Sequence, residues 1–511
     1  MHLGYWAGML PRPALTAAAL VTGALTVLLA GQEPSAPAFL DLPTLPAIDR
    51  GLREWDAPHP PGGARPAVTR PEAPDPERLD GSVIVRFKDD TPADTRIRVL
   101  SEIGGTRYPR TAWADFDVVA LEPGEDAEAA ARALDARADV EYAQPRYRIH
   151  KHYVPNDPLY ARQWNFPALD MERAWDINQG ASSRIVVAVL DSGVAFRNTT
   201  VRFTGRALPP FPALGAVEIP FAAAPELGGP DRFVAPRDFI WNTNVPLDLD
   251  GHGTHIAGTI GQVTNNGAGV AGMAFNVRLM PIKVLDGDWD AVFNSPLLAT
   301  DDLVARAIRY AADNGAHVLN LSVGREGAPA PAVRAAIEYA VGKGAFVVVA
   351  AGNEFEAGNR PNRYADFARD VAGMVAVSGT GRTNLRAFYS NTGPYVELAA
   401  PGGDMRRGGT AAGILQQTYD QDLVDRFFLS RFGPPRFDTF VYDYYQGSSM
   451  AAPHVAGFAA LLMQQGITSP AAIEAVMEAT ATDLGAPGRD NEFGYGLINP
   501  RAALRGMGLL K

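Results

Sequence analysis

The order of apolar and polar residues along the chain predicts a small folded unit that begins near residue 79. Apolar stretches at 82–87, 116–121 and 140–147 are typical of strands, and the segments 93–103 and 126–138 have helical spacing. Strand, helix, strand, helix, strand in this order predicts a split βαβ unit of about 70 residues.

A different pattern begins near residue 185. The runs at 185–190 and 346–351 are β-branched without polar alternation, which is typical of strands buried on both faces. Further strands are expected at 277–284 and 318–323, and helices at 252–261, 303–314 and 331–342. This alternation predicts an α/β fold, a mostly parallel sheet between two layers of helices. Ligands of such folds collect at the carboxyl ends of strands, where Asp191 and Asn353 stand.

The first 78 residues are expected to lie outside both folded units. Residues 14–30 are mostly apolar and uncharged and follow Arg12, which is the layout of a secretory signal. A stretch of about 17 residues is also near the short limit for a membrane span, so an uncleaved anchor is the alternative. We therefore assign 1–31 to a signal peptide or anchor and proline-rich 32–78 to a disordered linker. The folded domains are then 79–150 and 151–511.

Composition excludes several classes of function. The 57 acidic and 46 basic residues give a net charge of -11, and the sequence has no long run of one sign. The basic stretches that are typical of nucleic-acid-binding proteins are therefore missing from the sequence. The chain has no cysteine, which excludes disulfides, thiolate metal sites and a cysteine nucleophile. Nothing indicates an organic cofactor.

Three short motifs contain the groups of a hydrolytic triad. Asp191 lies in Val-Leu-Asp-Ser-Gly, His252 in Gly-His-Gly-Thr-His and Ser449 in Gly-Ser-Ser-Met-Ala-Ala-Pro-His. A serine hydroxyl becomes a good nucleophile when an imidazole takes its proton and a carboxylate orients that imidazole. Considered alone, Asp191 is equally typical of a turn and Ser449 is equally typical of a helix cap. His255 invites a zinc interpretation, but the Glu expected beside such a pair is absent.

With Ala-Ala-Gly-Asn at 350–353, these motifs resemble the subtilisin-like serine proteases, from about residue 156 to about 504. The resemblance implies that Ser449 is the nucleophile, His252 the general base and Asp191 its orienting carboxylate. It also implies that the Asn353 side chain and the Ser449 N–H bind the oxyanion. Ser448 is a departure, since the family normally has Thr there.

The unit at 79–150 resembles the inhibitory propeptide of the same family, on the sequence Val-Glu-Tyr-Ala-Gln-Pro at 140–145. An independent binding domain is the alternative. The propeptide interpretation implies a self-processing zymogen whose propeptide is an intramolecular inhibitor, cut between about residues 147 and 156. We also hypothesise that His150 and His152, beside this junction, sense pH during maturation.

The substrate is expected to add as a strand along Leu321, Ser322, Val323 and Gly324, because backbone hydrogen bonds bind an extended peptide with little sequence demand. The resemblance places the opposite wall near 285–289. Glu354 and Glu356 either bias the pocket toward a basic side chain or belong to a solvated loop.

A structural calcium ion is the implied cofactor. The loop 263–270 resembles the family's calcium loop, and Asn-Asp-Pro at 156–158 resembles the ligand segment of its thermitase-like branch. Asp157, Asn265 and Asn266 are the candidate ligands, since calcium prefers oxygen donors. Ordinary loop chemistry also favours Asn and Gly here.

Two segments are longer than the family pattern, 199–244 and 417–442, and both are rich in aromatic residues. They either shape the cleft, form a partner surface or make a satellite core. The sequence thus predicts a secreted or periplasmic serine endopeptidase, or one anchored to a membrane and facing outside. The rival is a catalytically silent subtilisin-like protein that binds peptides.

Overall fold

The computed structural model describes residues 78–508, except 104, 109, 111–112, 148–152, 208, 210 and 429–432. The predicted signal segment, nearly all of the linker, and His150 and His152 lie outside the described residues. The described residues form two compact units, one ending at Tyr147 and one beginning at Tyr153.

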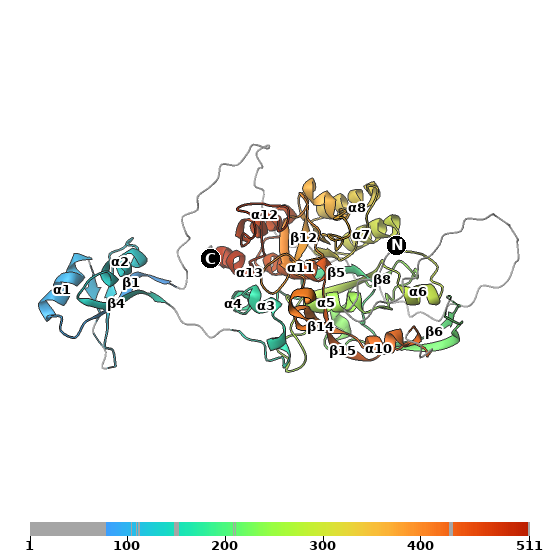
Figure 1. Ribbon diagram of the computed structural model, residues 1–511, viewed down its shortest axis with the longest axis horizontal. Coiled ribbons are helices and arrows are strands. Elements are labelled where there is room, and N and C mark those ends of the chain that lie inside the picture. Colours follow the sequence, from blue (N-terminus) through green and yellow to red (C-terminus); the bar gives the residue numbers. More distant parts are fainter. Residues whose placement is uncertain are drawn as a thin grey trace, which may run out of the picture. The chain divides into compact units, whose positions relative to one another are not determined.

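The N-terminal unit is a four-stranded antiparallel sheet with two helices (Figure 1). Its elements are β1 (Arg78–Phe87), α1 (Ala93–Glu102), β2 (Thr106–Arg107), β3 (Asp117–Ala120), α2 (Ala127–Asp135) and β4 (Val140–Tyr147). The strand order β2-β3-β1-β4 is that of a split βαβ fold, as predicted. Val83, Val85 and Phe87 alternate along β1 and pack with Leu134 of α2 in a separate core.

The C-terminal unit is built on a seven-stranded parallel sheet with the order β13-β12-β11-β10-β5-β9-β8. Its strands are β5 (Val186–Asp191), β8 (Arg237–Asp238), β9 (Arg278–Lys283), β10 (Val318–Leu321), β11 (Phe346–Ala350), β12 (Met374–Thr380) and β13 (Leu398–Pro401). The α/β class predicted from the sequence is confirmed. Strands β12 and β13 were not predicted.

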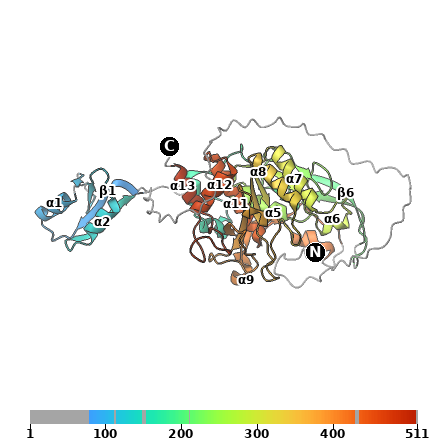
Figure 2. The same cartoon turned by 90° about the horizontal axis from the view of Figure 1, so that it is seen from above.

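Helices cover both faces of this sheet (Figures 1 and 2). Val187 and Val189 of β5 face one core with α5 (His252–Gly261), α11 (Ser448–Gln464) and α12 (Pro470–Thr480). Val186, Ala188 and Leu190 face the other core with α7 (Asp301–Asp313) and α8 (Pro331–Gly342). The sheet thus lies between two apolar layers, which explains the lack of polar alternation in β5.

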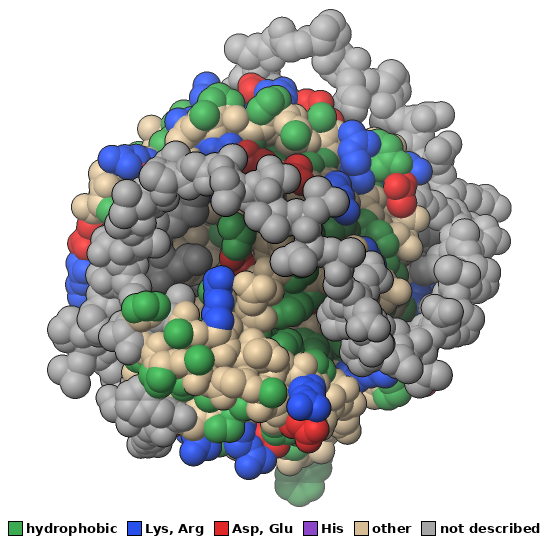
Figure 3. All heavy atoms as spheres, turned by 90° about the vertical axis from the view of Figure 1, so that its right-hand side faces the viewer, with side chains coloured by type: hydrophobic (Ala, Val, Ile, Leu, Met, Phe, Trp, Pro, Cys, Tyr) green, Lys and Arg blue, Asp and Glu red, His purple; other side chains and the backbone are tan. Residues whose placement is uncertain are grey.

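The remaining helices are shorter and lie around this framework. They are α3 (Asn165–Ala168), α4 (Met171–Ile177), α6 (Asp288–Val292), α9 (Met405–Gly408), α10 (Gln421–Val424) and α13 (Pro500–Gly508). Among the described residues, no helix is long and apolar enough to cross a membrane. On the face drawn in Figure 3, basic and acidic side chains are interspersed rather than grouped by sign.

The two long segments pack into the main core. The first contains the hairpin β6 (Thr199–Gly205) and β7 (Gly215–Phe221), and the second connects β14 (Ile414–Tyr419) to β15 (Phe440–Tyr445). Phe203, Phe221, Phe427 and Phe437 are buried in the same cluster as the sheet. The aromatic residues therefore extend the principal core. The prediction of a separate satellite core is wrong for these residues.

Candidate active site

Asp191 and His252 form a buried pair at the carboxyl end of β5. Oδ1 of Asp191 lies 2.5 Å from Nδ1 of His252 and also accepts a hydrogen bond from the Ser192 N–H at 2.8 Å. His252 is the first residue of α5, and both side chains are almost fully removed from solvent. The carboxylate therefore fixes the ring orientation of the imidazole.

Glycines allow the start of α5 to approach the end of β5 this closely. A Cβ on Gly253 would lie 2.0 Å from the carbonyl oxygen of Gly193. Gly193 itself has a φ of +114°, and a Cβ there would lie 2.7 Å from the Leu247 carbonyl oxygen. A side chain on Gly253 would push α5 away from the end of β5, and one on Gly193 would displace Leu247 and Asp248, which precede α5.

Asp248 ties the two elements together, and the sequence analysis missed it. Its buried carboxylate accepts hydrogen bonds from the Ser192 hydroxyl at 2.9 Å and from the N–H and hydroxyl of Thr254 at 3.0 and 2.6 Å. The neighbouring Asp250 accepts from the His252 N–H at 3.0 Å. The signal was present, because acidic residues just before a helix commonly bind its first N–H groups.

The surroundings of His252 stabilise its protonated imidazole more than bulk water would. Burial lowers the pKa of His252, but the charge and hydrogen bond of Asp191, with the charges of Asp250 and Asp248, outweigh it and raise the pKa above its ordinary value. An imidazolium that forms when His252 accepts a proton is therefore stabilised.

A buried lysine supports the same strand end. Lys283 of β9 pairs in register with Asp191, and its Nζ donates to the Ser192 carbonyl oxygen at 2.7 Å and to Asp290 of α6 at 3.1 Å. Asp290 also accepts from the Trp241 indole N–H at 2.6 Å. Burial lowers the pKa of Lys283, but Asp290, Asp238 and Asp248 raise it overall, so the ammonium stays charged. Sequence reasoning did not identify Lys283, since its partners lie on other elements.

At the start of α11, Ser448 fixes the carboxamide of Asn353. The Ser448 N–H and hydroxyl donate to Oδ1 of Asn353 at 2.8 and 2.9 Å, and the Gly352 N–H donates to the Ser448 hydroxyl at 3.1 Å. The Nδ2 of Asn353 and the Ser449 N–H nitrogen lie 3.5 and 3.6 Å from the point where a Cβ on Gly447 would stand. Two donors therefore border one space beside Gly447.

Ser449 lies beside the predicted substrate strand. Its hydroxyl donates to the Ser322 carbonyl oxygen at 3.4 Å, and the Ser322 hydroxyl donates to the Ser449 carbonyl oxygen at 2.8 Å. Helix α11 also packs against α5, which carries His252. The structure joins Asp191 to His252 and Asn353 to Ser448 by direct hydrogen bonds, while the hydroxyl of Ser449 contacts Ser322.

The predicted substrate strand begins at Leu321, the last residue of β10. Leu321, Ser322 and Val323 are buried and Gly324 is exposed. Asn362 donates to the carbonyl oxygens of Val323 at 3.2 Å and Ala350 at 2.7 Å, which holds this segment beside the strand that leads to Asn353. Gly324 leaves the space that Asn362 fills, since a Cβ would lie 2.1 Å from its carboxamide.

Both glutamates after Asn353 are paired. Glu354 accepts from the Asn353 N–H at 2.7 Å and from Asn391 at 3.0 Å. Glu356 forms an ion pair with Arg406 at 2.5 Å. Each carboxylate is therefore engaged within the protein. Glu356 is exposed, and Glu354 holds the backbone N–H of Asn353, while a preference for a basic side chain stays a prediction.

The other histidines of the motifs are buried structural residues. Nε2 of His255 lies 3.0 Å from the Ile414 carbonyl oxygen, and its ring stacks on Tyr445. His454 lies 2.8 Å from the Asn165 carboxamide nitrogen. Burial lowers the pKa of His255 to about 3 and that of His454 to about 4, so both rings are neutral.

The candidate calcium loop wraps around Asp157. Its carboxylate accepts from the N–H groups of Asn265 at 2.7 Å and Asn266 at 3.4 Å. The side-chain oxygens of these residues accept from the N–H groups of Asn156 and Ala268 at 3.2 and 2.9 Å. The asparagines therefore shape the loop through hydrogen bonds of their own.

Glu226 also faces this loop, and sequence reasoning missed it. It is 6% exposed and so close to Gly269 that a Cβ there would lie 2.1 Å from its Oε2. Burial raises the pKa of Glu226, and the charge of Asp157 raises it further. Within the described part of the chain, the nearby Oε1 of Gln262 is buried without a hydrogen-bond partner. This set of oxygen donors fits a hard cation.

A parallel sheet with a buried Asp–His pair at one strand end and a serine at the start of a central helix is the arrangement of a serine hydrolase. Residues 182–496 match the Subtilase family model of peptidase S8, and residues 65–146 match the fervidolysin N-terminal prodomain. The chain belongs to the subtilase family and is a serine-type endopeptidase with a prodomain.

Individual relatives agree with this assignment. The thermophilic serine proteinase of Bacillus sp. (strain AK1) is 31% identical over 82% of this chain and 86% of its own length. Thermitase of Thermoactinomyces vulgaris is 32% identical over 66% of this chain and 94% of its own. The structure of fervidolysin from Fervidobacterium pennivorans, a keratinolytic enzyme related to subtilisin, has a TM-score of 0.51 over 84% of this chain and 62% of its own, at 24% identity, and supports the fold.

Proposed function

We propose that this subtilase is made as a self-processing zymogen and cleaves peptide bonds through Asp191, His252 and Ser449. The observation that carries the proposal is the buried Asp191–His252 pair at 2.5 Å. The carboxylate orients the imidazole and raises its pKa, which are the two properties that a general base requires, and the helix that begins with Ser448 and Ser449 packs against α5.

The mechanism follows from this geometry. Ser449 turns its hydroxyl from Ser322 toward the substrate carbonyl, and His252 takes its proton as the Oγ–C bond forms. The oxyanion accepts hydrogen bonds from the Ser449 N–H and from Asn353, whose carboxamide Ser448 has already oriented. His252 then protonates the leaving amine, and water releases the acyl-enzyme by the same steps. The substrate pairs with Leu321, Ser322, Val323 and Gly324.

We assign residues 79–150 to the inhibitory propeptide and 151–511 to the peptidase domain. The prodomain match at 65–146 and the compact unit that ends at Tyr147 support this division. Maturation would cut the chain between about residues 147 and 156. Export is proposed from the charge and apolar pattern of residues 1–31, with retention as a membrane anchor as the alternative.

We also propose that the loop at 263–270 binds a structural calcium ion. Asp157 and Glu226 would supply charged oxygens, with Gln262 and the backbone of the Asn265–Asn266 turn as neutral donors. A bound ion would neutralise the two carboxylates and hold the segment after the maturation site against the loop. Asn265 and Asn266, the ligands expected from the sequence, act in this proposal mainly by shaping the loop.

Labelling by a serine-directed phosphonate tests the catalytic proposal. The processed protein should lose peptidase activity as one phosphonate attaches to Ser449, located by peptide mass mapping. Ser449→Ala and His252→Ala should remain unlabelled, and Ser101→Ala, on the surface of α1, should leave the rate unchanged if the propeptide is removed. A folded, processed protein that neither labels nor cleaves peptides would favour the silent peptide-binding alternative.

A further inference from the structure

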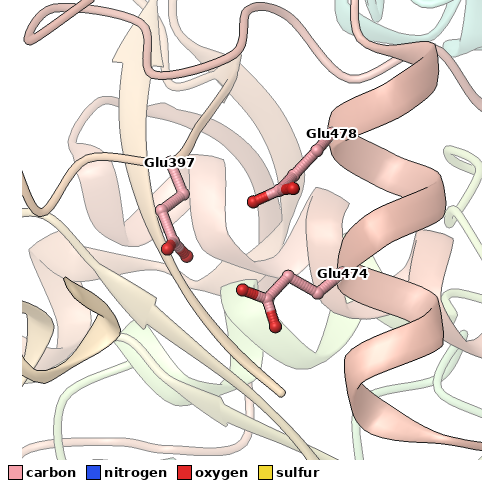
Figure 4. A group of neighbouring side chains, drawn as sticks. All are labelled: Glu397, Glu474 and Glu478. Carbon is pink, nitrogen blue, oxygen red and sulfur yellow. The ribbon is translucent and has the colours of Figure 1, made fainter. Parts of the chain in front are cut away.

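Three glutamates from separate parts of the peptidase unit meet away from the catalytic residues. Glu397 precedes β13, and Glu474 and Glu478 lie one turn apart on α12. Figure 4 shows all three carboxylates directed toward one another, and one oxygen of each lies within 4.8 Å of the others. This cluster is not part of the triad, the substrate strand or the loop around Asp157.

Glu397 supplies an independent sign of a missing ligand. The residue is 6% exposed, and its Oε2 is buried without a hydrogen-bond partner among the residues that the structure describes. Leaving a buried polar atom unpaired costs about 1–3 kcal/mol, and more when it is charged. Figure 4 shows this carboxylate pointing into the space between Glu397 and α12.

The backbone prevents the carboxylates from separating easily. The Glu397 N–H donates to the Ala376 carbonyl oxygen at 3.1 Å, and its carbonyl oxygen accepts from the Tyr495 N–H at 2.7 Å. Glu474 accepts from the Gly373 N–H at 2.5 Å, which fixes it from the side of β12. The backbone of Glu397 and the side chain of Glu474 are thus held by separate parts of the fold.

In the described ranges, neither Glu397 nor Glu474 forms an ion pair with Lys or Arg. Arg489 is the cation whose charge acts on Glu397, but its guanidinium donates to the Pro394 and Val396 carbonyl oxygens at 2.6 and 3.2 Å. A bound cation would give the buried Oε2 of Glu397 the partner that it lacks among the described residues.

We propose that Glu397, Glu474 and Glu478 bind a calcium ion that links α12 to the sheet. Calcium takes carboxylate oxygens at about 2.3–2.6 Å, so one ion can bridge oxygens up to about 5 Å apart, and water completes its coordination. The spacing in the cluster meets this limit without movement of the backbone. The ion would hold α12 against β12 and β13 and so stabilise the C-terminal part of the peptidase unit.

Calcium binding to the Ser449→Ala protein tests the proposal, because removing the proposed nucleophile limits self-digestion. Isothermal titration with calcium chloride, after treatment with a chelator, gives the number of ions bound per chain. Glu474→Gln and Glu478→Gln should each bind one ion fewer. Glu338→Gln, an exposed glutamate on α8, should bind the same number as the parent. Asp157→Asn identifies the separate contribution of the loop.

Thermal unfolding gives a second readout that does not depend on activity. Calcium should raise the unfolding temperature of the parent more than that of either glutamine variant, while the variants equal or exceed the parent in chelator because repulsion is relieved. Unchanged stoichiometry with an unchanged calcium-dependent rise would overturn the proposal. If Glu474→Gln fails to fold, Glu478→Gln, which loses no contact to the Gly373 N–H, provides the same comparison.

Discussion

The N–H and hydroxyl of Ser448 both donate to the side-chain oxygen of Asn353, at 2.8 and 2.9 Å. An amide whose oxygen is held in this way presents its nitrogen in one direction. The relationship makes Ser448 a positioning residue for the proposed oxyanion donor, although its side chain does not reach the reacting atoms.

Asn353→Ala should lower kcat by about 10²–10³-fold with little change in KM, because one oxyanion donor is lost and this effect acts on the transition state. Ser448→Ala should lower kcat by a smaller factor, and Ser448→Thr should restore it, since threonine keeps the hydroxyl. Steady-state kinetics on protein titrated for active sites measures both. A loss confined to KM would contradict an oxyanion role.

The pH profile should depend on Asp250. His252 acts as a base when neutral, so its raised pKa places the acid limb of kcat/KM above about 6.5. Burial, and then the charge of Asp248, raise the pKa of Asp250 to about 6, and the ionised carboxylate in turn raises the pKa of His252. Asp250→Asn removes negative charge, destabilises the imidazolium and should move the acid limb to lower pH. Asp231→Asn, at an exposed position, is the control and should leave the acid limb unchanged. Equal pH profiles for the parent, Asp250→Asn and Asp231→Asn would exclude an effect of Asp250 on the pKa of His252.

Lys283→Met should destabilise the peptidase unit by about 3–5 kcal/mol, because it leaves buried Asp290 without its cation. Urea unfolding in the Ser449→Ala background measures the loss. Lys343→Met breaks the exposed ion pair between the residue after α8 and Asp313 of α7, and it should destabilise the unit far less. If the two variants lose similar amounts of unfolding free energy, the buried Lys283–Asp290 ion pair does not stabilise the end of β9 as proposed.

Phe427→Ala should cost about 3–5 kcal/mol, because this side chain is 1% exposed and packs against Trp289 and Phe211. Trp289 lies on α6, in the expected wall of the cleft, and its indole donates to the Val424 carbonyl oxygen at 3.0 Å. The substitution should therefore also raise KM for peptides. Exposed Leu298→Ala is the matched control for stability and should change it by less than about 0.5 kcal/mol.

The sequence predicted the elements whose apolar pattern is continuous, such as β5 and β11, and the catalytic candidates that lie in short motifs. It did not predict β14, because Gln416, Gln417 and Thr418 are polar yet buried, with Gln416 bonded to the Ala271 carbonyl oxygen. Such a strand has no apolar alternation to detect.

Supporting residues were missed for a related reason. Lys283 acts on Ser192 and Glu226 acts on the loop around Gly269 through contacts between distant parts of the chain. A local motif contains both the residue and its context, as for His252 beside Gly251. A buried charge whose partner lies on another strand has no local signature, so the fold must be known before its role can be assigned.

Self-processing tests the central claim most directly. The wild-type protein and Ser449→Ala, both lacking residues 1–31, would be incubated with calcium and examined by intact mass and N-terminal sequencing. We predict that the wild type loses its propeptide by a cut between residues 147 and 156, while Ser449→Ala stays full length. Processing of both proteins at the same bond, or of neither although both are folded, would contradict cleavage by Ser449 of its own chain.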